Sequence, residues 1–365
     1  MKIKKIAAIL TAGALMTGMT ACGGGSSTEA SKSDEKSASV ESSAVSESSE
    51  TAEISQGSET GDKELKEIDV VLDWYPNAIH TFLYEAANNG YFEEEGLKVN
   101  LISPAESIDA ITFVASGKAQ IGLTYPVEIV QANENDMPVK ALAAVAQKPL
   151  GCLCSLKENT DVTSDMSSLK GKKVGYSGTA AGEAVIRTIT RNAGLEDSDY
   201  ELINVGFDLV TSLTTKSVDI VGGTFINDEV VTMENAGYEL NVYNEEDYGV
   251  PVRYGLVMAV NDDAYNADPE IYKAFLRACD KGFQDMIADE DAALDVIMND
   301  MNSDDNPLDE VQQRESYEIL IKLMQTDDAK FLSMSNDTWQ AVIDWMNESG
   351  LADTELTAKD ITIQD

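Results

Sequence analysis

Short β-prone runs alternate with segments of helical periodicity along the first half of the folded part of the chain. Apolar residues predict strands over residues 68–72, 99–102, 120–123 and 139–146. Between them, helical spacing predicts helices over residues 78–89, 107–116 and 127–135. Strands that alternate with helices indicate a mostly parallel sheet with helices on both faces.

The same alternation restarts after residue 171. Strands are predicted over 173–176, 200–205, 218–222 and 239–243, with helices over 180–192 and 209–215 and a short one after Asn227. A further strand at 254–260 precedes a helical region, with helices near 269–288, 291–301, 308–323 and 337–348.

A second α/β unit is therefore predicted, and the late helices need a sheet to cover. The arrangement we favour has a first lobe of residues 67–152 plus 253–365 and an inserted second lobe of residues 153–252. Two consecutive domains joined once are the alternative, and periodicity alone leaves both open.

The N-terminal segment has the pattern of an export signal. Three lysines, Lys2, Lys4 and Lys5, precede an apolar stretch over 6–16 that is too short to span a bilayer. Small residues before Cys22 resemble a bacterial lipobox, so we expect residues 1–22 to be removed up to an acylated Cys22. An ordinary secretory signal is the alternative. Residues 23–66 are rich in Ser and Glu, which predicts a disordered stalk.

Charge and cysteine usage narrow the function classes. Asp and Glu number 65 against 26 Lys and Arg, a formal net charge of −39, which excludes nucleic acid as a partner. Beyond Cys22 the cysteines are Cys152, Cys154 and Cys279, an odd number without C-x-x-C spacing, which argues against a disulfide framework or a zinc site. We interpret Cys152 and Cys154 as buried small hydrophobic residues.

No reactive constellation is visible in the sequence. His80 is the only histidine, so a histidine-rich metal site is excluded, and no activated nucleophile or paired base accompanies it. We expect no cofactor, no metal and no catalytic residue.

Four segments carry a resemblance to a known family. Residues 72–81 read LDWYPNAIHT, 91–97 read YFEEEGL, 116–122 read SGKAQIG and 168–175 read SLKGKKVG. These motifs resemble the periplasmic-binding-protein family that includes sulfonate binders and thiamine-pyrimidine-precursor proteins, and the W-x-P-N-x-x-H order resembles the pyrimidine branch.

The resemblance implies the α/β type II periplasmic-binding-protein fold, in which two α/β lobes joined by a hinge close on a small solute in the cleft between them. It further implies an extracytoplasmic substrate-binding lipoprotein of an ABC importer, attached to the cell membrane by its lipid alone. We expect a monomer that binds a thiamine pyrimidine precursor of the hydroxymethyl- or formylamino-pyrimidine type and docks on an ABC permease.

Other functions stay open at this point. The solute could instead be riboflavin, a sulfonate or nitrate, or the lipoprotein could sense a ligand rather than deliver it. An exported enzyme on the same fold is the third class, but the enzymes of the pyrimidine branch are cytosolic and carry a cysteine-rich motif that this chain lacks.

The first predicted lobe supplies four candidate ligand-binding residues. Trp74 follows the first strand, where ligands of open α/β sheets bind, and its indole can stack on a flat ring. Asn77 offers a donor and an acceptor, although it also suits a helix cap. His80 lies in the first helical turn, facing either the cleft or the core. Tyr125 begins a helix after a strand and is predicted to stack opposite Trp74.

The second predicted lobe supplies the other candidates. Gly178 and Thr179 form a loop before a helix, whose free N–H groups can bind an anion or a carbonyl. The pyrimidine branch usually carries an acidic residue in this loop, close to G-E-F-G, whereas residues 177–183 here read SGTAAGE. Glu183 is the candidate replacement. Asn227, at another junction of a strand and a helix, either contacts the ligand or caps the helix.

Overall fold

The computed structural model describes residues 65–104, 109–206, 208–304 and 306–363. The predicted signal segment, the predicted acylation site Cys22 and nearly all of the predicted stalk lie outside these residues. Among the described helices, none is both long enough and apolar enough to cross a membrane.

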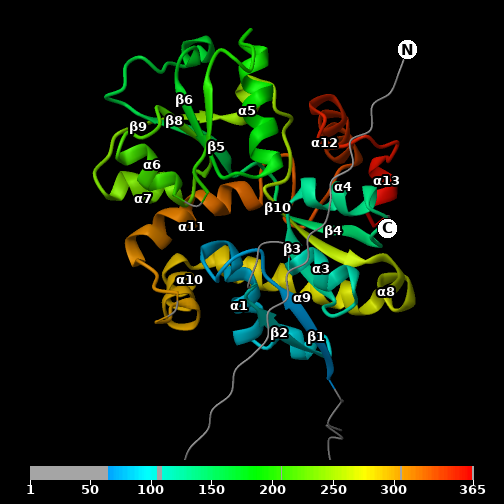
Figure 1. Cartoon of the computed structure of the whole chain (residues 1–365). Coiled ribbons are helices and arrows are strands. Elements are labelled where there is room, and N and C mark those ends of the chain that lie inside the picture. Colours follow the sequence, from blue (N-terminus) through cyan, green and yellow to red (C-terminus); the bar gives the residue numbers. More distant parts are fainter. Residues whose placement is uncertain (1–64, 105–108, 207, 305, 364–365) are drawn as a thin grey trace, which may run out of the picture. The chain divides into compact units, whose positions relative to one another are not determined.

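The first sheet has five strands in the order β2-β1-β3-β10-β4 (Figure 1). Their bounds are β1 Lys66–Val71, β2 Leu97–Ile102, β3 Ile121–Thr124, β4 Val139–Ala146 and β10 Leu256–Asn261. Strand β1 pairs in parallel with β2 and β3, and β10 runs antiparallel between β3 and β4. The chain therefore leaves this sheet after β4 and returns to it with β10.

The second sheet also has five strands, in the order β7-β6-β8-β5-β9. Their bounds are β5 Gly151–Leu156, β6 Lys173–Tyr176, β7 Glu201–Asn204, β8 Ile220–Phe225 and β9 Leu240–Asn244. Strand β6 pairs in parallel with β7 and β8, and β5 runs antiparallel to β8 and β9. The two sheets thus repeat one pattern, and β1, β3 and β10 of the first correspond to β6, β8 and β5 of the second.

The prediction of mostly parallel sheets is confirmed, with one antiparallel strand in each: β10 in the first sheet and β5 in the second. Each antiparallel strand, β10 or β5, is the first strand after the chain crosses from the other sheet, so it runs against its neighbours. Sequence reasoning did not identify β5 as a strand. It did predict the state of Cys152 and Cys154, which are buried free thiols beside the same Thr224 hydroxyl.

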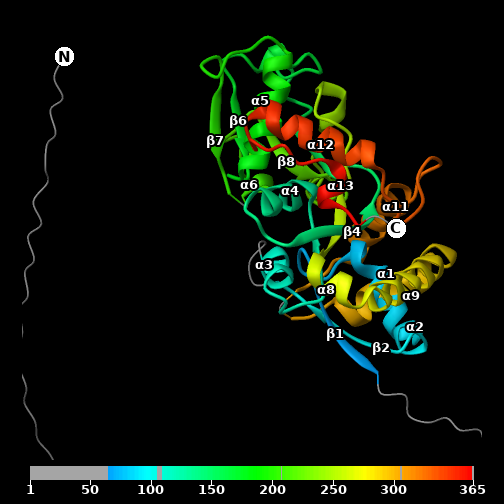
Figure 2. The same cartoon turned by 90° about the vertical axis from the view of Figure 1, so that its right-hand side faces the viewer.

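Helices cover both sheets (Figures 1 and 2). Those before β10 are η1 Ala78–His80, α1 Thr81–Asn88, α2 Tyr91–Glu94, α3 Asp109–Ala115, α4 Pro126–Glu134, η2 Met166–Leu169, α5 Ala180–Asn192, α6 Leu209–Thr214, α7 Glu229–Asn235 and η3 Glu245–Tyr248. Those after it are α8 Asp262–Ala267, α9 Pro269–Ala288, α10 Glu290–Val296, the π-turn Ile297–Met301, α11 Glu310–Met324, α12 Asn336–Ser349 and α13 Ala358–Ile361.

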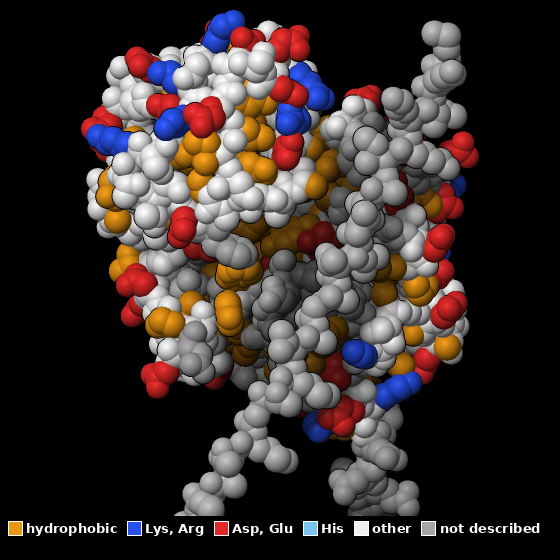
Figure 3. Space-filling model, in the orientation of Figure 1, with side chains coloured by type: hydrophobic (Ala, Val, Ile, Leu, Met, Phe, Trp, Pro, Cys, Tyr) orange, Lys and Arg blue, Asp and Glu red, His pale blue; other side chains and the backbone are white. Residues whose placement is uncertain are grey.

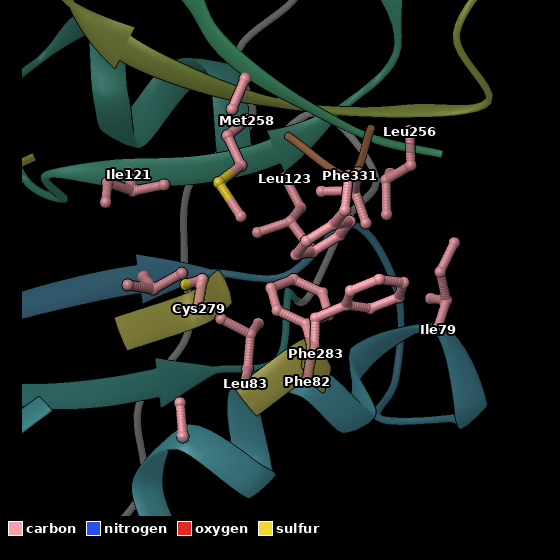
Figure 4. Close-up of a cluster of buried hydrophobic side chains, with 14 of the residues drawn as sticks. Ile79, Phe82, Leu83, Ile121, Leu123, Leu256, Met258, Cys279, Phe283 and Phe331 are labelled. Atoms are coloured by element: carbon pink, nitrogen blue, oxygen red, sulfur yellow. The ribbon is translucent and has the colours of Figure 1, made fainter. Parts of the chain in front are cut away.

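The core under the first sheet is built by α1 and α9 (Figure 4). The ring of Phe283 stacks on that of Phe331 with centroids 4.1 Å apart, and Phe82 meets Phe331 edge to face at 5.1 Å. The two helices approach closely because Gly282 has no side chain: a Cβ there would lie 2.2 Å from the carbonyl oxygen of Phe82. Burial of these large apolar side chains fixes α1, and with it the loop that precedes it.

Candidate functional site

The loop between β1 and α1 is held by reciprocal hydrogen bonds at its helical end. The Asn77 side-chain oxygen accepts from the N–H of Ile79 at 3.1 Å, and the N–H of Asn77 donates to Nδ1 of His80 at 3.2 Å. These contacts form a capping box, which satisfies donors that a helix start leaves open. Asn77 therefore acts as a helix cap in this structure, and its contact with a ligand stays a prediction.

Asp73 connects this loop to the one after β3. Its Oδ1 lies 2.9 Å from Nε2 of His80, and its Oδ2 accepts from the Tyr125 hydroxyl at 2.7 Å. Because Nδ1 of His80 accepts from a backbone N–H, Nε2 is the nitrogen that carries the proton and donates to Asp73. Burial and the Asp73 carboxylate raise the pKa of Tyr125 well above its usual value, so the phenol stays a donor.

His80 is enclosed by this network. Its side chain is 0% exposed, and Asp73 is 8% exposed. Both ring nitrogens of His80 have partners, so in this structure the ring orients Asp73 and the capping loop and faces no solvent. Direct contact between His80 and a ligand remains a prediction that would need this loop to open.

Trp74 points away from the buried network. It is 42% exposed, and its ring meets the exposed Tyr75 edge to face with centroids 6.0 Å apart. The ring of Tyr125 lies beside that of Phe225 of the second sheet, with centroids 6.2 Å apart, and its stacking on a ligand opposite Trp74 stays a prediction. The end of β1 therefore presents a broad indole surface on which a flat ring can stack.

The loops after β3 and β8 are both held by a hydrogen bond to a glutamate side chain. Each strand ends at a residue that is held by a glutamate four positions later: the Thr124 hydroxyl donates to Glu128, and the Phe225 N–H donates to Oε2 of Glu229 at 2.7 Å. Burial, followed by the neighbouring Asp228 carboxylate, raises the pKa of Glu229 to about 7. A carboxyl group that is half-ionised near neutral pH thus lies at the end of β8.

Asn227, between Phe225 and Glu229, is 7% exposed. Its side-chain nitrogen donates to the Ser316 hydroxyl at 3.2 Å, while its Oδ1 is buried and has no hydrogen-bond partner among the described residues. Buried polar atoms in native structures almost always have a partner, so this oxygen is an acceptor that a ligand donor can satisfy. The side chain does not cap α7.

The loop after β6 is organised locally. Gly178 has φ +80° and lies against the side chain of Asn204, and Thr179 caps α5 by accepting from the N–H of Gly182 at 3.1 Å. Glu183 is engaged by Arg187, whose Nε donates to its Oε1 at 2.8 Å, and the Tyr176 hydroxyl lies 3.5 Å from its Oε2. The predicted acid of this loop is therefore held in an ion pair.

The structure brings some candidates together and leaves others apart. Asn77, His80 and Tyr125 join one hydrogen-bonded network through Asp73, and Tyr125 reaches the second sheet at Phe225, beside Asn227. The contacts described for Gly178, Thr179 and Glu183 all stay within the second sheet and α5. Figure 3 shows a hollow in this face of the molecule, with hydrophobic and acidic side chains visible in it.

Two further hollows lie elsewhere among the described residues. Each has a volume of about 290 Å³. The lining of one includes Leu156 and Asp219, and the lining of the other includes Asp291 and Arg314. Neither includes a candidate binding residue. No group of three or more His, Cys, Asp or Glu side chains in the described part of the chain is arranged to hold a metal ion.

Sequence reasoning missed Asp73, Glu229 and Ser316. Asp73 directly precedes the W-x-P-N-x-x-H segment and lacks a pattern of its own. The sequence contains a pattern that could have identified Glu229, because Glu128 and Glu229 both stand four residues after the end of a strand. Ser316 comes from a helix far along the chain, and only the tertiary packing reveals it.

This architecture is the periplasmic-binding-protein fold. The periplasmic aliphatic sulphonate binding protein SsuA from Escherichia coli is a solved structure with a TM-score of 0.65, at 11% sequence identity, covering 81% of this chain and 97% of that one. At that identity the likeness concerns the fold.

The chain belongs to the NMT1/THI5-like family, which matches residues 77–293. A formylaminopyrimidine-binding protein from Halalkalibacterium halodurans is 35% identical over 299 residues, which is 82% of this chain and 90% of the relative. A 4-amino-5-hydroxymethyl-2-methylpyrimidine phosphate synthase from Aspergillus parasiticus is 27% identical over 245 residues, 64% of this chain and 70% of the relative. The family and the type II fold predicted from the motifs are confirmed.

Proposed function

We propose that the protein is the extracytoplasmic substrate-binding lipoprotein of an ABC importer and captures a formylamino- or hydroxymethyl-pyrimidine precursor of thiamine. The similarity to the formylaminopyrimidine-binding protein, which extends over most of both chains, is the observation that carries the proposal. A solute-binding role rather than catalysis is part of it.

The chemistry of the strand ends supports an aminopyrimidine as the ligand. The exposed indole of Trp74 offers a stacking surface, and the unpartnered Oδ1 of Asn227 accepts a hydrogen bond. Glu229 adds a carboxylate that can accept from an exocyclic amine. The ligand would thus stack on the first lobe and donate to the second.

The lobe boundaries are part of the proposal. Lobe 1 comprises residues 67–152 plus 253–365, lobe 2 comprises residues 153–252, and the hinge lies near residues 151–155 and 247–253. Next to the hinge, the buried Glu245 carboxylate forms an ion pair with the Arg253 guanidinium at 2.5 Å. The same carboxylate lies against Gly151, where a Cβ would come within 2.7 Å of it. Closure about this hinge would bring Gly178 and Thr179 toward Trp74.

Membrane attachment and the transport partner complete the proposal. Acyl chains on Cys22 would tether the protein to the outer face of the cell membrane, and residues 23–66 would give the lobes reach. The closed monomer would dock on an ABC permease. Mass spectrometry of the membrane-extracted protein tests the anchor: a diacylated N-terminal Cys22 is expected, and an unmodified N-terminus beyond Cys22 would contradict it.

A phosphate synthase is the second candidate, because relatives with that name align over 64% of the chain. The two functions are distinguished by incubating the purified protein and testing by mass spectrometry whether a pyrimidine phosphate forms. Its formation would indicate a synthase. Both ring nitrogens of the enclosed His80 are engaged in hydrogen bonds, which supports binding over a catalytic role for this residue.

Calorimetric titration of the purified protein tests the proposed ligand. Formylamino- and hydroxymethyl-pyrimidine are expected to bind with micromolar or lower Kd, while riboflavin, taurine and nitrate serve as comparators. Binding of a comparator alone would move the protein to another solute. Binding of none, together with no co-purifying permease, would contradict the import role and favour sensing.

A further inference from the structure

Helix α11 is anchored in the lobe of the first sheet. Its apolar face carries Tyr317, Leu320 and Met324, all buried in the core that includes α1 and α9. The Tyr317 hydroxyl also donates to the carbonyl oxygen of Met286 on α9 at 2.6 Å. Figure 1 shows α11 between α7 of the second lobe and the helices of the first. A helix fixed in this way can determine the positions of the loops that its other side chains contact.

The same face of α11, one turn before Tyr317, holds the loop that carries Asn77. The side-chain oxygen of Gln313 accepts from the backbone N–H of Ala78 at 3.0 Å, and Gln313 is only 6% exposed. Ala78 is the first residue of η1, directly after Asn77 and two positions before His80. The hydrogen bond therefore fixes the start of the capping box relative to α11.

A neighbouring face of α11, with Gln312 and Ser316, holds the loop after β8 and the helix α7. The Gln312 amide nitrogen donates to Oδ1 of Asp228 at 3.0 Å and to the Thr232 hydroxyl at 2.8 Å. One turn later the Ser316 hydroxyl accepts from Asn227 at 3.2 Å. Except for an exposed contact between Glu315 and Asn235 at 2.9 Å, these are neutral side chains of α11 meeting polar groups of the second lobe.

We propose that α11 positions the two candidate binding loops relative to each other, with Gln313 holding the loop after β1 and Gln312 and Ser316 holding the loop after β8. Gln312 and Gln313 are positioning residues in this account, because they act on the ligand through the loops they hold. The inference rests on the proposed function for its ligand, but the positions of the loops are measurable without any ligand.

The chemistry of these contacts suits reversible opening. A neutral amide that leaves a carboxylate or hydroxyl can exchange its hydrogen bond for one to water at little net cost, whereas a buried ion pair cannot. Helix α12 also reaches the second lobe, since Trp345 donates to Thr188 of α5 at 3.0 Å. Cutting the contacts of α11 therefore loosens the loops without separating the lobes at α12.

The test uses Gln312→Met and Gln313→Met, which keep side-chain length and remove the amide, alone and together. Glu318→Ala, an exposed position on the same helix, is the matched control. We expect each single variant to weaken formylaminopyrimidine binding by about 5–30-fold, because a competent arrangement of the loops is populated less. The two links act in series through α11, so the double variant is expected to lose little more than either single variant.

A ligand-free distance measurement separates this inference from the identity of the ligand. Spin labels at Lys98→Cys and Lys157→Cys report on the two lobes, in a Cys22→Ser background. The cysteines Cys152, Cys154 and Cys279 are buried, and burial raises the pKa of each thiol, so they label slowly. Pulsed electron paramagnetic resonance is expected to show a longer distance population in Gln312→Met, because the contacts of Gln312 join the two lobes, and an unchanged distribution in Glu318→Ala.

The outcomes are distinguishable. Wild-type protein that binds no pyrimidine would overturn the proposed function, while the distance change would still support the role of α11. Wild-type binding with unchanged distances and affinities in both variants would overturn the inference. Fully additive losses of binding affinity in the double variant would also overturn the inference. They would show that each substitution causes its own local defect, rather than that both act through α11.

Discussion

The loop after β1 and the loop after β6 occupy equivalent places in two sheets of the same pattern, yet they are held in different ways. The first is held by a buried network: the Asp73 carboxylate accepts hydrogen bonds from His80 at the end of the same loop and from Tyr125 at the neighbouring strand end. The second is exposed and held by short-range contacts, with Thr179 capping its own helix and Glu183 paired one turn along it.

This difference indicates a division of labour between the lobes. A buried network in which every donor has a partner resists rearrangement, because breaking it leaves unsatisfied groups in the interior. An exposed loop stabilised by a cap and a surface ion pair rearranges at little cost. The first lobe thus presents a fixed platform at Trp74, and the loop at Gly178 is free to adapt to the ligand during closure.

The largest effect is expected for Asp73→Ala. The substitution leaves the Nε2–H of the fully buried His80 and the Tyr125 hydroxyl without their acceptor, which should lower the free energy of unfolding by about 2–4 kcal/mol. Urea denaturation followed by circular dichroism measures it. Tyr125→Phe removes one of the two donors and should cost less, and equal costs for the two variants would contradict the bridging role of Asp73.

A second effect, on the order of 2 kcal/mol, should appear in the pH dependence of stability. The pKa of Glu229 is raised from 4.5 to about 7 in the folded state. The folded state therefore holds a proton that the unfolded state has lost, so stability falls as pH rises from about 4.5 to about 7. Unfolding free energies across this range should decline less in Glu229→Gln than in wild type, and parallel profiles would contradict the raised pKa.

Gly178→Ala is expected to cost about 1–3 kcal/mol, because it combines two penalties. The residue has φ +80°, and a Cβ would lie 2.4 Å from the Asn204 amide nitrogen. Gly171→Ala is the matched control, since its φ is +76° and a Cβ there would meet no atom within 4 Å beyond its chain neighbours. Thermal melts should show a larger loss for Gly178→Ala, and equal losses would mean that the loop adjusts freely to Asn204.

Thr179→Ala should lower the free energy of unfolding by about 1 kcal/mol, as expected for loss of an N-cap side chain. Thr179→Ser keeps the hydroxyl and should restore most of this stability. A loss from Thr179→Ala as large as that from Asp73→Ala would remove the contrast between the two loops.

The smallest effect is expected for Glu183→Gln, below about 0.5 kcal/mol, because its ion pair with Arg187 is partly exposed and screened by water. Chemical denaturation at low and high salt measures it. A loss well above this range would show that the acid of this loop is structurally essential, contrary to the account of an adaptable loop.

Much of the fold was predictable from periodicity. The bounds of β6, α5 and α9 agree with the prediction, because each segment has a strong local pattern and clear end signals. Strand β5 was missed because residues on both of its faces are buried, which removes the alternation that identifies a strand. The single π-turn at residues 297–301 has no sequence signature either.

The candidate site was predictable only in part. Strand ends followed by Trp, Tyr or Asn identified the loops, since ligands of open sheets bind there. The sequence could not show that His80 faces inward to Asp73, because a helix start leaves both orientations open. The contact between Ser316 of α11 and Asn227 joins residues 89 positions apart along the chain and follows only from tertiary packing.

The central claim is that one ligand is held by loops of both sheets. Calorimetric titration of formylaminopyrimidine into wild type, Trp74→Ala and Asn227→Ala tests it most directly, because each variant changes one lobe. We predict that both variants weaken binding at least about tenfold while remaining folded, as expected for loss of a stacking surface or a buried acceptor. Undiminished affinity in either variant would contradict a site shared between the lobes.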